Sequence, residues 1–231
     1  QRLGVLNRVL RHNLQNDMTV VLSYAELLPD LEGERRDEAI EEIVETGSGL
    51  VEHGRKARKV EEAMRSAEDG LVEHDLAGIV ADVLGDLAAE YPDARIENDL
   101  PDTVPVAGIE SLYDAVESVC ENALEHGDEH PLLRVETERP DDGDVVRLRV
   151  VDDGPGIPEY ERRVVAEGAE TDLEHGSGLG LFLATWVVEK SGGEVGFEVP
   201  EGGGTTVTLT LPTADAVESG DGSANGPGNE P

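Results

Sequence analysis

Cysteine and long apolar runs are nearly absent from this sequence, and each absence excludes a class of protein. Cys120 is the only cysteine, so the chain can form neither an internal disulfide nor a cysteine-based zinc cluster. No apolar run approaches the ~20 residues that span a bilayer, and no signal peptide is visible. We therefore expect a cytoplasmic chain without a membrane segment of its own. The sequence leaves open whether a longer protein is attached to a membrane.

Positively charged residues are also scarce in this sequence. The 231 residues include 18 lysines and arginines against 52 acidic residues, which gives a formal net charge of −34. A chain this acidic is repelled by nucleic acids and by anionic lipid, so neither is an expected partner. An acidic, hydrated surface suits a saline cytoplasm, where salt screens the self-repulsion, and we expect a halophilic source.

Residues 1–68 carry the spacing of two long helices. Apolar residues recur at three- and four-residue steps in two segments, which are separated by a turn at Pro29 and Gly33. The chain begins at Gln1 inside the first segment, and we expect a piece of a longer protein. Two helices alone bury too little apolar surface, so this hairpin is predicted to dimerise into a four-helix bundle.

Residues 72–212 change to alternating strand and helix patterns. Strands are predicted at 95–99, 132–138, 144–152, 193–199 and 205–211, and helices at 76–91, 109–126 and 179–192. This alternation indicates a layered domain with helices on one face of a sheet, so the predicted fold class is α+β, a helical hairpin followed by a two-layer α/β sandwich. Residues 213–231 are rich in Gly, Ser, Asn, Asp and Pro and are predicted to be a disordered tail.

A histidine lies on the first predicted helix, away from its apolar stripe. His12 is two residues from both Leu10 and Leu14, a step that turns it to the opposite side, and Asn16 follows one turn later. Neutral imidazole is a capable nucleophile near pH 7. An exposed histidine on a helix is more often ordinary surface, so this residue alone decides nothing.

The predicted helix 109–126 ends in the polar sequence ENALEHG. Asn122 offers a hard amide oxygen of the kind that suits magnesium, and Glu121 and His126 share this end of the helix. The plainer alternative is a polar helix end that is capped by Gly127.

Two glycine-rich segments have the composition of nucleotide-binding loops. In VVDDGPGIP, Asp152 ends an apolar strand as an acceptor for an exocyclic amine such as that of adenine, and Gly154 and Gly156 let a ring approach the backbone. In GSGLGL, 176–181, glycines precede a helix whose first N–H groups can bind phosphate. The alternatives are a surface turn and an ordinary glycine loop, since GSGLGL is neither a dinucleotide fingerprint nor a Walker A loop.

The order of these segments resembles that of a sensor histidine kinase of two-component systems. RHNLQN, around His12, is similar to the phosphoacceptor box, ENALEHG to the N box, DDGPGI to the G1 box and GSGLGL to the G2 box. The resemblance covers residues 1–212, and the acidic coat and the RHNLxN form look most like haloarchaeal members. It implies a dimerisation and phosphotransfer hairpin of the HisKA type at 1–68, followed by an ATP-binding domain of the GHKL (Bergerat) type at 72–212.

The resemblance also implies a role for each matching residue. His12 would accept the γ-phosphoryl group of ATP, Asn122 would hold Mg²⁺ on the triphosphate, and Asp152 would bind the adenine amine with help from Thr205. His126 stands where the family often has a basic residue that contacts phosphate. The residues implied to shape the adenine pocket and the phosphate loop are Gly154, Gly156, Gly176, Ser177, Gly178, Leu179 and Gly180. A homodimer would pass the phosphoryl group to an aspartate of a response regulator receiver domain.

The sequence departs from the family pattern at several positions. Asn13 replaces the acidic residue that often follows the histidine, and its amide can orient the ring but cannot take a proton. Asp17 or Glu121 could act as the base in place of that acidic residue. Alternatively, no base is needed, because the imidazole is already neutral before it reacts.

Asn16 falls four residues after His12, at a position where the family often has an Asn or Thr that is associated with phosphatase activity. The resemblance therefore implies an enzyme with both kinase and phosphatase activity. Ser118 stands where the N box of the family has an earlier asparagine. The segment between the G1 and G2 boxes, which forms a lid over ATP in the family, is short here and lacks the expected phenylalanine, so the sequence does not define how the lid closes.

Two other functions stay open beside an ATP-dependent protein-histidine kinase. One is an ATPase of the same superfamily, against which the hairpin with His12 argues. The other is a non-catalytic dimerisation scaffold that binds nucleotide or nothing, against which Asn122, Asp152 and the glycine segments argue.

Overall fold

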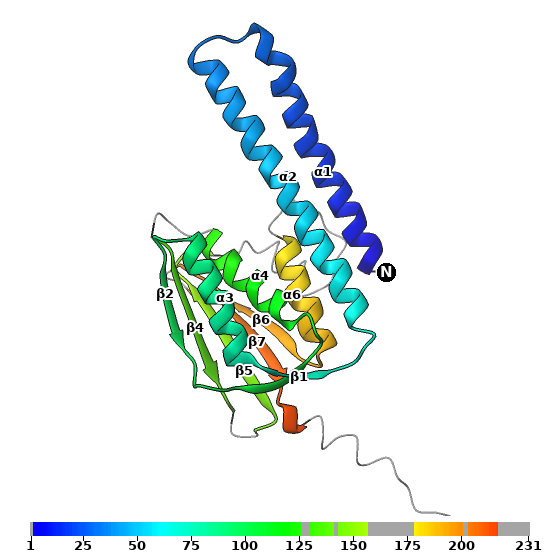
Figure 1. The fold of residues 1–231 in the computed structure, drawn as a ribbon, viewed down its shortest axis with the longest axis vertical. Coiled ribbons are helices and arrows are strands. Elements are labelled where there is room, and N and C mark those ends of the chain that lie inside the picture. The colour runs from blue at the N-terminus through cyan, green and yellow to red at the C-terminus, as the bar shows by residue number, and fades with distance from the viewer. Residues whose placement is uncertain (1, 126–129, 141–142, 157–177, 201–202, 217–231) are drawn as a thin grey trace, which may run out of the picture. The chain divides into compact units, whose positions relative to one another are not determined.

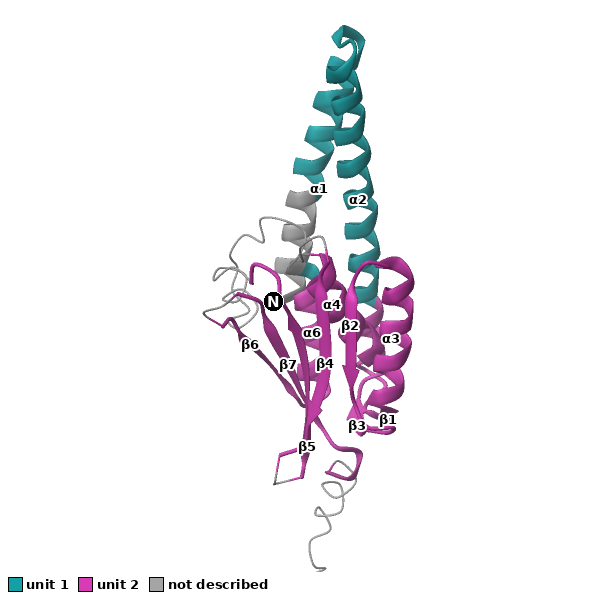
Figure 2. Cartoon of the chain, turned by 90° about the vertical axis from the view of Figure 1, so that its left-hand side faces the viewer, with its two compact units in different colours: residues 1–61, 159–179 teal, residues 62–158, 180–231 magenta. Residues whose placement is uncertain are grey.

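The computed structural model describes residues 2–125, 130–140, 143–156, 178–200 and 203–216, and for residues 2–13 it describes the backbone alone. The chain divides into two compact units, which are residues 1–61 with 159–179 and residues 62–158 with 180–231 (Figure 2).

Two long helices and a short turn make up the first unit. Helix α1 is Arg2–Leu27, the 3-10 helix η1 is Leu28–Asp30, and α2 is Glu34–Ser66, whose last turn belongs to the second unit (Figure 1). Gly33 reverses the chain with a φ of 57°, a left-handed conformation that glycine adopts without strain. Asp17 Oδ2 of α1 lies 3.4 Å from His53 Nδ1 of α2, and this contact sets the register of the two antiparallel helices.

One side of the hairpin leaves a row of large apolar side chains exposed. The members on α1 are Leu14, Met18 and Leu22, and those on α2 are Ile40, Val44 and Val51. Steps of four residues on α1, and of four and seven on α2, place them along one face of each helix, a spacing that is typical of a face that packs against another element. Exposed apolar rows of this kind mark interaction surfaces.

A five-stranded sheet with the order β2-β4-β5-β7-β6 forms the centre of the second unit. Its strands are β2 (Arg95–Asp99), β4 (Leu132–Glu138), β5 (Val145–Asp152), β6 (Glu194–Glu198) and β7 (Thr206–Pro212). β2 pairs parallel with β4, and the other neighbours are antiparallel. A separate antiparallel pair joins β1 (Val72–Asp75) to β3 (Pro105–Gly108).

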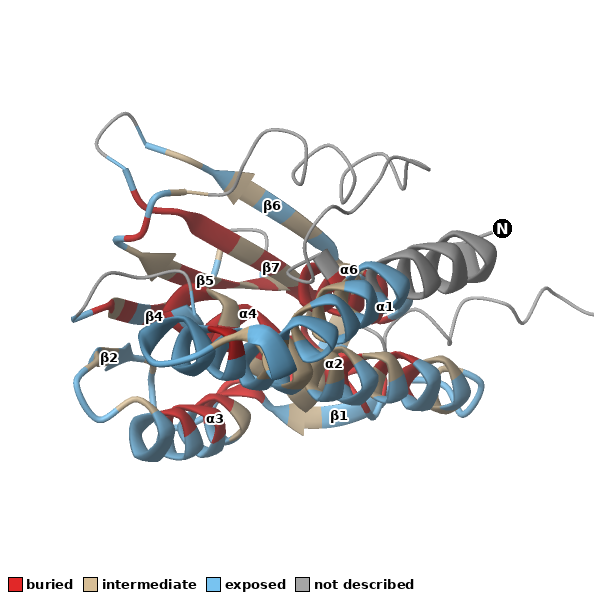
Figure 3. Cartoon of the chain, turned by 90° about the horizontal axis from the view of Figure 1, so that it is seen from above, coloured by how far each residue is buried: buried red, intermediate tan, exposed pale blue. Residues whose placement is uncertain are grey.

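Three helices cover one face of this sheet, α3 (Leu76–Glu90), α4 (Leu112–Glu125) and α6 (Gly178–Lys190) (Figure 1). Along β5, Val146, Leu148 and Val150 are buried and the residues between them are not, so alternate side chains form the core beneath the helices. Figure 3 shows the same division on α3, which is buried on one side and exposed on the other.

The predicted strands and helices of this unit are confirmed, each to within three residues at either end. The four-residue strands β1 and β3 were not predicted. Among the helices that the structure describes, none combines the length and the apolar character needed to cross a membrane.

Candidate nucleotide-binding site

Asp152 is the last residue of β5, and two backbone donors fix its carboxylate. Oδ1 accepts hydrogen bonds from the N–H groups of Gly154 at 2.9 Å and Thr205 at 3.0 Å. The Asp152 N–H in turn donates to the Thr205 carbonyl oxygen at 3.0 Å. Both backbone N–H groups bond to Oδ1, and Oδ2 has lone pairs with which it can accept from a ligand.

Partial burial raises the pKa of Asp152 above its ordinary value, because desolvation penalises the charged carboxylate. The hydrogen bonds from Gly154 and Thr205 lower this pKa and offset part of the effect, whereas the charge of Asp153 raises it further. A partly desolvated acceptor forms stronger hydrogen bonds than one in open water. The carboxylate is therefore well suited to select one donor group of a ligand.

Glycines let the backbone close tightly around this carboxylate. Gly156 and Gly204 have φ values of 87° and 81°, which residues with side chains rarely adopt. A Cβ at Gly204 would collide with the Asp152 carbonyl oxygen, and one at Gly156 would lie 3.0 Å from Cγ1 of Val199. The Gly204 N–H donates to the Gly154 carbonyl at 2.7 Å, which ties the loop after β5 to the turn before β7.

Asp153 fixes the other side of the same loop. Its Oδ1 accepts a hydrogen bond from the Leu132 N–H at 2.9 Å, at the start of β4. Sequence reasoning assigned no role to Asp153 or to Gly204. Asp153 is the second acidic residue of the DDG sequence, and Gly204 ends the glycine run before the last strand. Both patterns are visible in the sequence, but each also fits an ordinary turn.

The C-terminal half of α4 carries the predicted magnesium ligand. Asn122 is half-buried, and its neighbour Glu121 is buried at 8% exposure. In the part of the chain that the structure describes, no cluster of three or more His, Cys, Asp or Glu side chains could hold a metal ion. A magnesium ion at this site would therefore depend on Asn122, on water and on ligand phosphates, the donor set that Mg²⁺ commonly has beside a nucleotide.

The second glycine segment meets α4 at the start of α6. The helix begins at Gly178, so Gly178, Leu179 and Gly180 lie in its first turn rather than ahead of it. Leu179 is buried at 2% exposure, and a Cβ at Gly180 would lie 3.4 Å from the Ser118 Oγ of α4. The first turn of a helix presents N–H groups without intrahelical partners, and these can bind an anion.

Several predicted site residues lie outside the described residues. These are His126, Gly176 and Ser177, together with the side chains of His12 and Asn13, whose backbone is part of α1. Asn16 is exposed on α1. The structure thus brings Asp152, Gly154, Gly156 and Thr205 together as one group and Gly180 against α4 as a second. Within the described residues, no hydrogen bond joins Asn122 to the first group.

The layered fold and the fixed aspartate at the end of β5 can be compared with known proteins. Residues 108–215 match the family described as Histidine kinase-, DNA gyrase B-, and HSP90-like ATPase. This match supports ATP binding by residues 108–215.

Similar proteins extend the comparison beyond this domain. The sensor-type histidine kinase PrrB of Mycobacterium tuberculosis is 28% identical over 210 residues, which cover 88% of this chain and 46% of PrrB. The chain thus spans about half the length of this curated relative. The solved structure of the mycobacterial sensor histidine kinase MprB has a TM-score of 0.53 at 28% identity, over 62% of this chain and 97% of that one. Acinetobacter baumannii histidine kinase AdeS, with a TM-score of 0.59 over 88% of this chain and 98% of its own, is 18% identical and shows the fold alone. PrrB and MprB are both named as sensor histidine kinases.

Proposed function

We propose that this chain is the core of a protein-histidine kinase, which binds Mg²⁺-ATP, phosphorylates His12 and passes the phosphoryl group to an aspartate of a receiver domain. The observation that carries the proposal is the Asp152 carboxylate, which is held on Oδ1 by the N–H groups of Gly154 and Thr205 while Oδ2 can accept from a ligand. The match of residues 108–215 to the ATPase family and the kinase relatives support it.

The residues of the site fit a nucleotide. An acceptor oxygen on Asp152 matches the exocyclic amine of adenine, and Gly156, with a φ of 87°, brings no side chain of its own to this site. Asn122 offers a neutral oxygen ligand, and a bound Mg²⁺ would supply charge neutralisation on the triphosphate. The first turn of α6, with Gly178 and Gly180, offers N–H groups to phosphate. From the resemblance we assign further phosphate contacts to Gly176, Ser177 and His126.

The His12 imidazole acts as the nucleophile toward the substrate ATP. One ring nitrogen forms a bond to the γ-phosphorus while the bond from that phosphorus to the bridging oxygen breaks, and the electron pair leaves with ADP. Asn13 can hold the ring by accepting its other N–H. Asp17 is less suited to this role, because its carboxylate already lies 3.4 Å from His53 Nδ1. Glu121 stays a candidate for removing a proton.

A dimer and a receiver domain complete the proposed cycle. The exposed apolar row of the hairpin, with Met18 at 46% and Val51 at 75% exposure, supports a four-helix bundle of two chains. Asn16 is exposed on α1, where an incoming receiver domain could meet it, and this supports a phosphatase activity beside the kinase.

The decisive experiment is incubation with γ-labelled ATP and Mg²⁺ in molar potassium chloride. We expect label that is lost in acid, kept in base and absent from a His12→Gln variant. Label retained by that variant would contradict the proposal. Release of free phosphate without labelled protein would instead favour a superfamily ATPase, and failure to bind Mg²⁺-ATP in calorimetry would favour a scaffold.

A further inference from the structure

Two consecutive aspartates stand at the end of β5, and their side chains bond to opposite neighbours of that strand. Asp152 Oδ1 accepts from the N–H group of Thr205, which leads into β7. Asp153 Oδ1 accepts from the N–H group of Leu132, which begins β4. Because β5 lies between β4 and β7 in the sheet, the loop that follows it is held from both sides.

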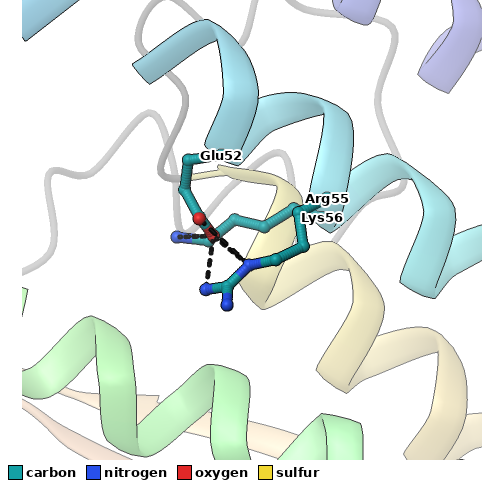
Figure 4. Close-up of polar contacts among 3 residues, drawn as sticks. All are labelled: Glu52, Arg55 and Lys56. Carbon is teal, nitrogen blue, oxygen red and sulfur yellow. Dashed lines mark hydrogen bonds and ion pairs between the residues drawn. The ribbon is translucent and has the colours of Figure 1, made fainter. Parts of the chain in front are cut away.

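The contact of Asp153 differs from the polar contacts that form within one helix. On α2, Glu52 pairs with Arg55 and Lys56, three and four residues later on the same helix (Figure 4). Pairs at this spacing support a single helix. Asp153 and Leu132 are 21 residues apart in the sequence, so their hydrogen bond fixes the position of a loop against a separate strand.

On the β7 side, the backbone itself closes against the two aspartates. A Cβ added at Gly204 would collide with the Asp152 carbonyl oxygen and would lie 3.5 Å from Asp153 Cα. The Gly204 N–H group also donates to the Gly154 carbonyl oxygen at 2.7 Å. The peptide between the aspartates is therefore in direct contact with the segment before β7.

On the β4 side, the hold depends on the side chain of Asp153. The last ladder pair of the two strands is Leu133 with Asp152. Beyond it, the bond to Leu132 is the tie to β4 that the described residues of this loop make. Without that tie, residues 153–156 are held from the β7 side alone, and the loop can turn together with the Asp152 carboxylate. Selection of one donor on a ligand needs an acceptor that stays within about 10–20° of its productive direction.

Folding alone does not require this contact. Leu132 is half-buried and Asp153 is exposed, so water could pair with both polar groups if the contact were absent. An exposed hydrogen bond of this kind adds little to the free energy of folding. Its consequence is the position of the loop, which carries the carboxylate that we propose binds adenine.

We propose that Asp153 is a positioning residue for base selectivity, which holds the loop after β5 against β4 so that Asp152 Oδ2 meets the exocyclic amine of adenine. The inference rests on the proposed binding of ATP and adds the residue that makes the site prefer adenine to a purine without that amine. Asp153 itself contacts no ligand and takes part in no covalent step. Any side-chain oxygen that accepts from the Leu132 N–H group serves the same purpose, so the charge of Asp153 is not required.

The test measures binding of ADP and IDP to the full chain by calorimetry in the presence of Mg²⁺. IDP has a carbonyl oxygen in place of the exocyclic amine, and neither diphosphate has a γ-phosphoryl group to transfer. Wild type should prefer ADP by about a hundredfold, because a polar site rejects a ligand that cannot pair with it. Asp153→Ala should weaken the binding of ADP by about tenfold and leave that of IDP nearly unchanged. Asp153→Asn keeps an acceptor oxygen and should recover most of the preference.

Asp75→Ala is the matched control. Asp75 Oδ1 accepts from the Val104 N–H group at 2.9 Å, across 29 residues of sequence, beside the separate β1–β3 pair. The same oxygen accepts from the Ala77 N–H group and caps α3. Its loss removes a hydrogen bond of the same kind away from β5, so the melting temperature should fall at least as far as in Asp153→Ala. The preference for ADP should stay at the wild-type value.

Several outcomes would overturn the assignment. An unchanged preference in a folded Asp153→Ala variant means that Asp152 is held without Asp153. Equal weakening of ADP and IDP indicates a general loosening of the domain. If Asp153→Asn loses the preference as Asp153→Ala does, the charge matters and the hydrogen bond does not. Wild type without a preference for ADP contradicts both this assignment and adenine recognition by Asp152. Because only binding is measured, a failure of His12 to take up label from ATP contradicts the proposed kinase and leaves the assignment of Asp153 standing.

Discussion

Ser118 of α4 faces Gly180 in the first turn of α6, and a Cβ added at Gly180 would lie 3.4 Å from the Ser118 Oγ. Ser118 is 4% exposed, so the space between the two helices is already filled. This contact joins the helix that carries Asn122 to the helix start that we propose binds phosphate. Two small residues thus set the spacing of the two parts of the site.

Replacing Ser118 by asparagine, the residue that the family resemblance leads one to expect, should destabilise the domain. The larger side chain has no free space against Gly180, and overpacking of this kind costs about 1–3 kcal/mol. Ser118→Ala is the control and should cost about 1 kcal/mol or less. Chemical denaturation measures both. An asparagine variant that is as stable as wild type would show that the helices can separate without cost.

The Asp152→Asn variant should separate nucleotide binding from folding. The amide oxygen of asparagine can still accept from the N–H groups of Gly154 and Thr205, so the free energy of unfolding should change by about 1 kcal/mol or less. The amide nitrogen would then face the ligand as a donor, opposite another donor on adenine. We expect at least about a hundredfold weaker binding of ATP in calorimetry, because a buried polar group is left without a partner. Unchanged affinity would exclude Asp152 from adenine recognition.

The affinity for ATP should also depend on pH through Asp152. Burial raises its pKa above the ordinary 3.8, so protonation removes the acceptor at a higher pH than for an exposed aspartate. Affinity should be full above this raised pKa and fall as the pH decreases through it. The sign for folding is opposite, because a raised pKa means that acidification relieves the cost of burying the charge. ATP binding measured from pH 7 downwards checks the prediction. The Asp152→Asn variant is the control, because its side chain does not titrate and its affinity should lack this dependence on pH.

The sequence predicts the main elements because their signals are local. Strand β7 alternates threonine with valine or leucine from Thr206 to Leu211, and α4 repeats its apolar residues every three or four positions. Strands β1 and β3 have four residues each, and their pairing brings together segments about 30 residues apart, which no local pattern reveals. Similarly, Asp152 meets a donor 53 residues later in the chain, so its fixed orientation follows only from the paired strands. The role of His12 rests on the order of motifs and not on any contact of its side chain.

Cys120 should be inert toward thiol reagents in the folded protein. It is fully buried on α4, and burial raises the pKa of its thiol to about 12, with a further contribution from Glu117. Thiolate, which is the reactive form, is then negligible near pH 8. A thiol reagent should label the chain only after denaturation, and the rate should follow unfolding. Rapid labelling under native conditions would show that α4 opens locally.

The exposed apolar row should hold two chains together, and a charge within it should separate them. Met18 is 46% exposed in the single chain, and a glutamate at this position would lose its hydration in a four-helix bundle without gaining a partner. Met18→Glu should therefore weaken the dimer by about tenfold or more, as measured by light scattering over a dilution series. Ser23→Glu adds the same charge at an exposed position about 140° round α1, so it should leave the dimer intact. If both variants dissociate alike, the effect is general repulsion in an acidic chain. If neither does, the row serves another partner.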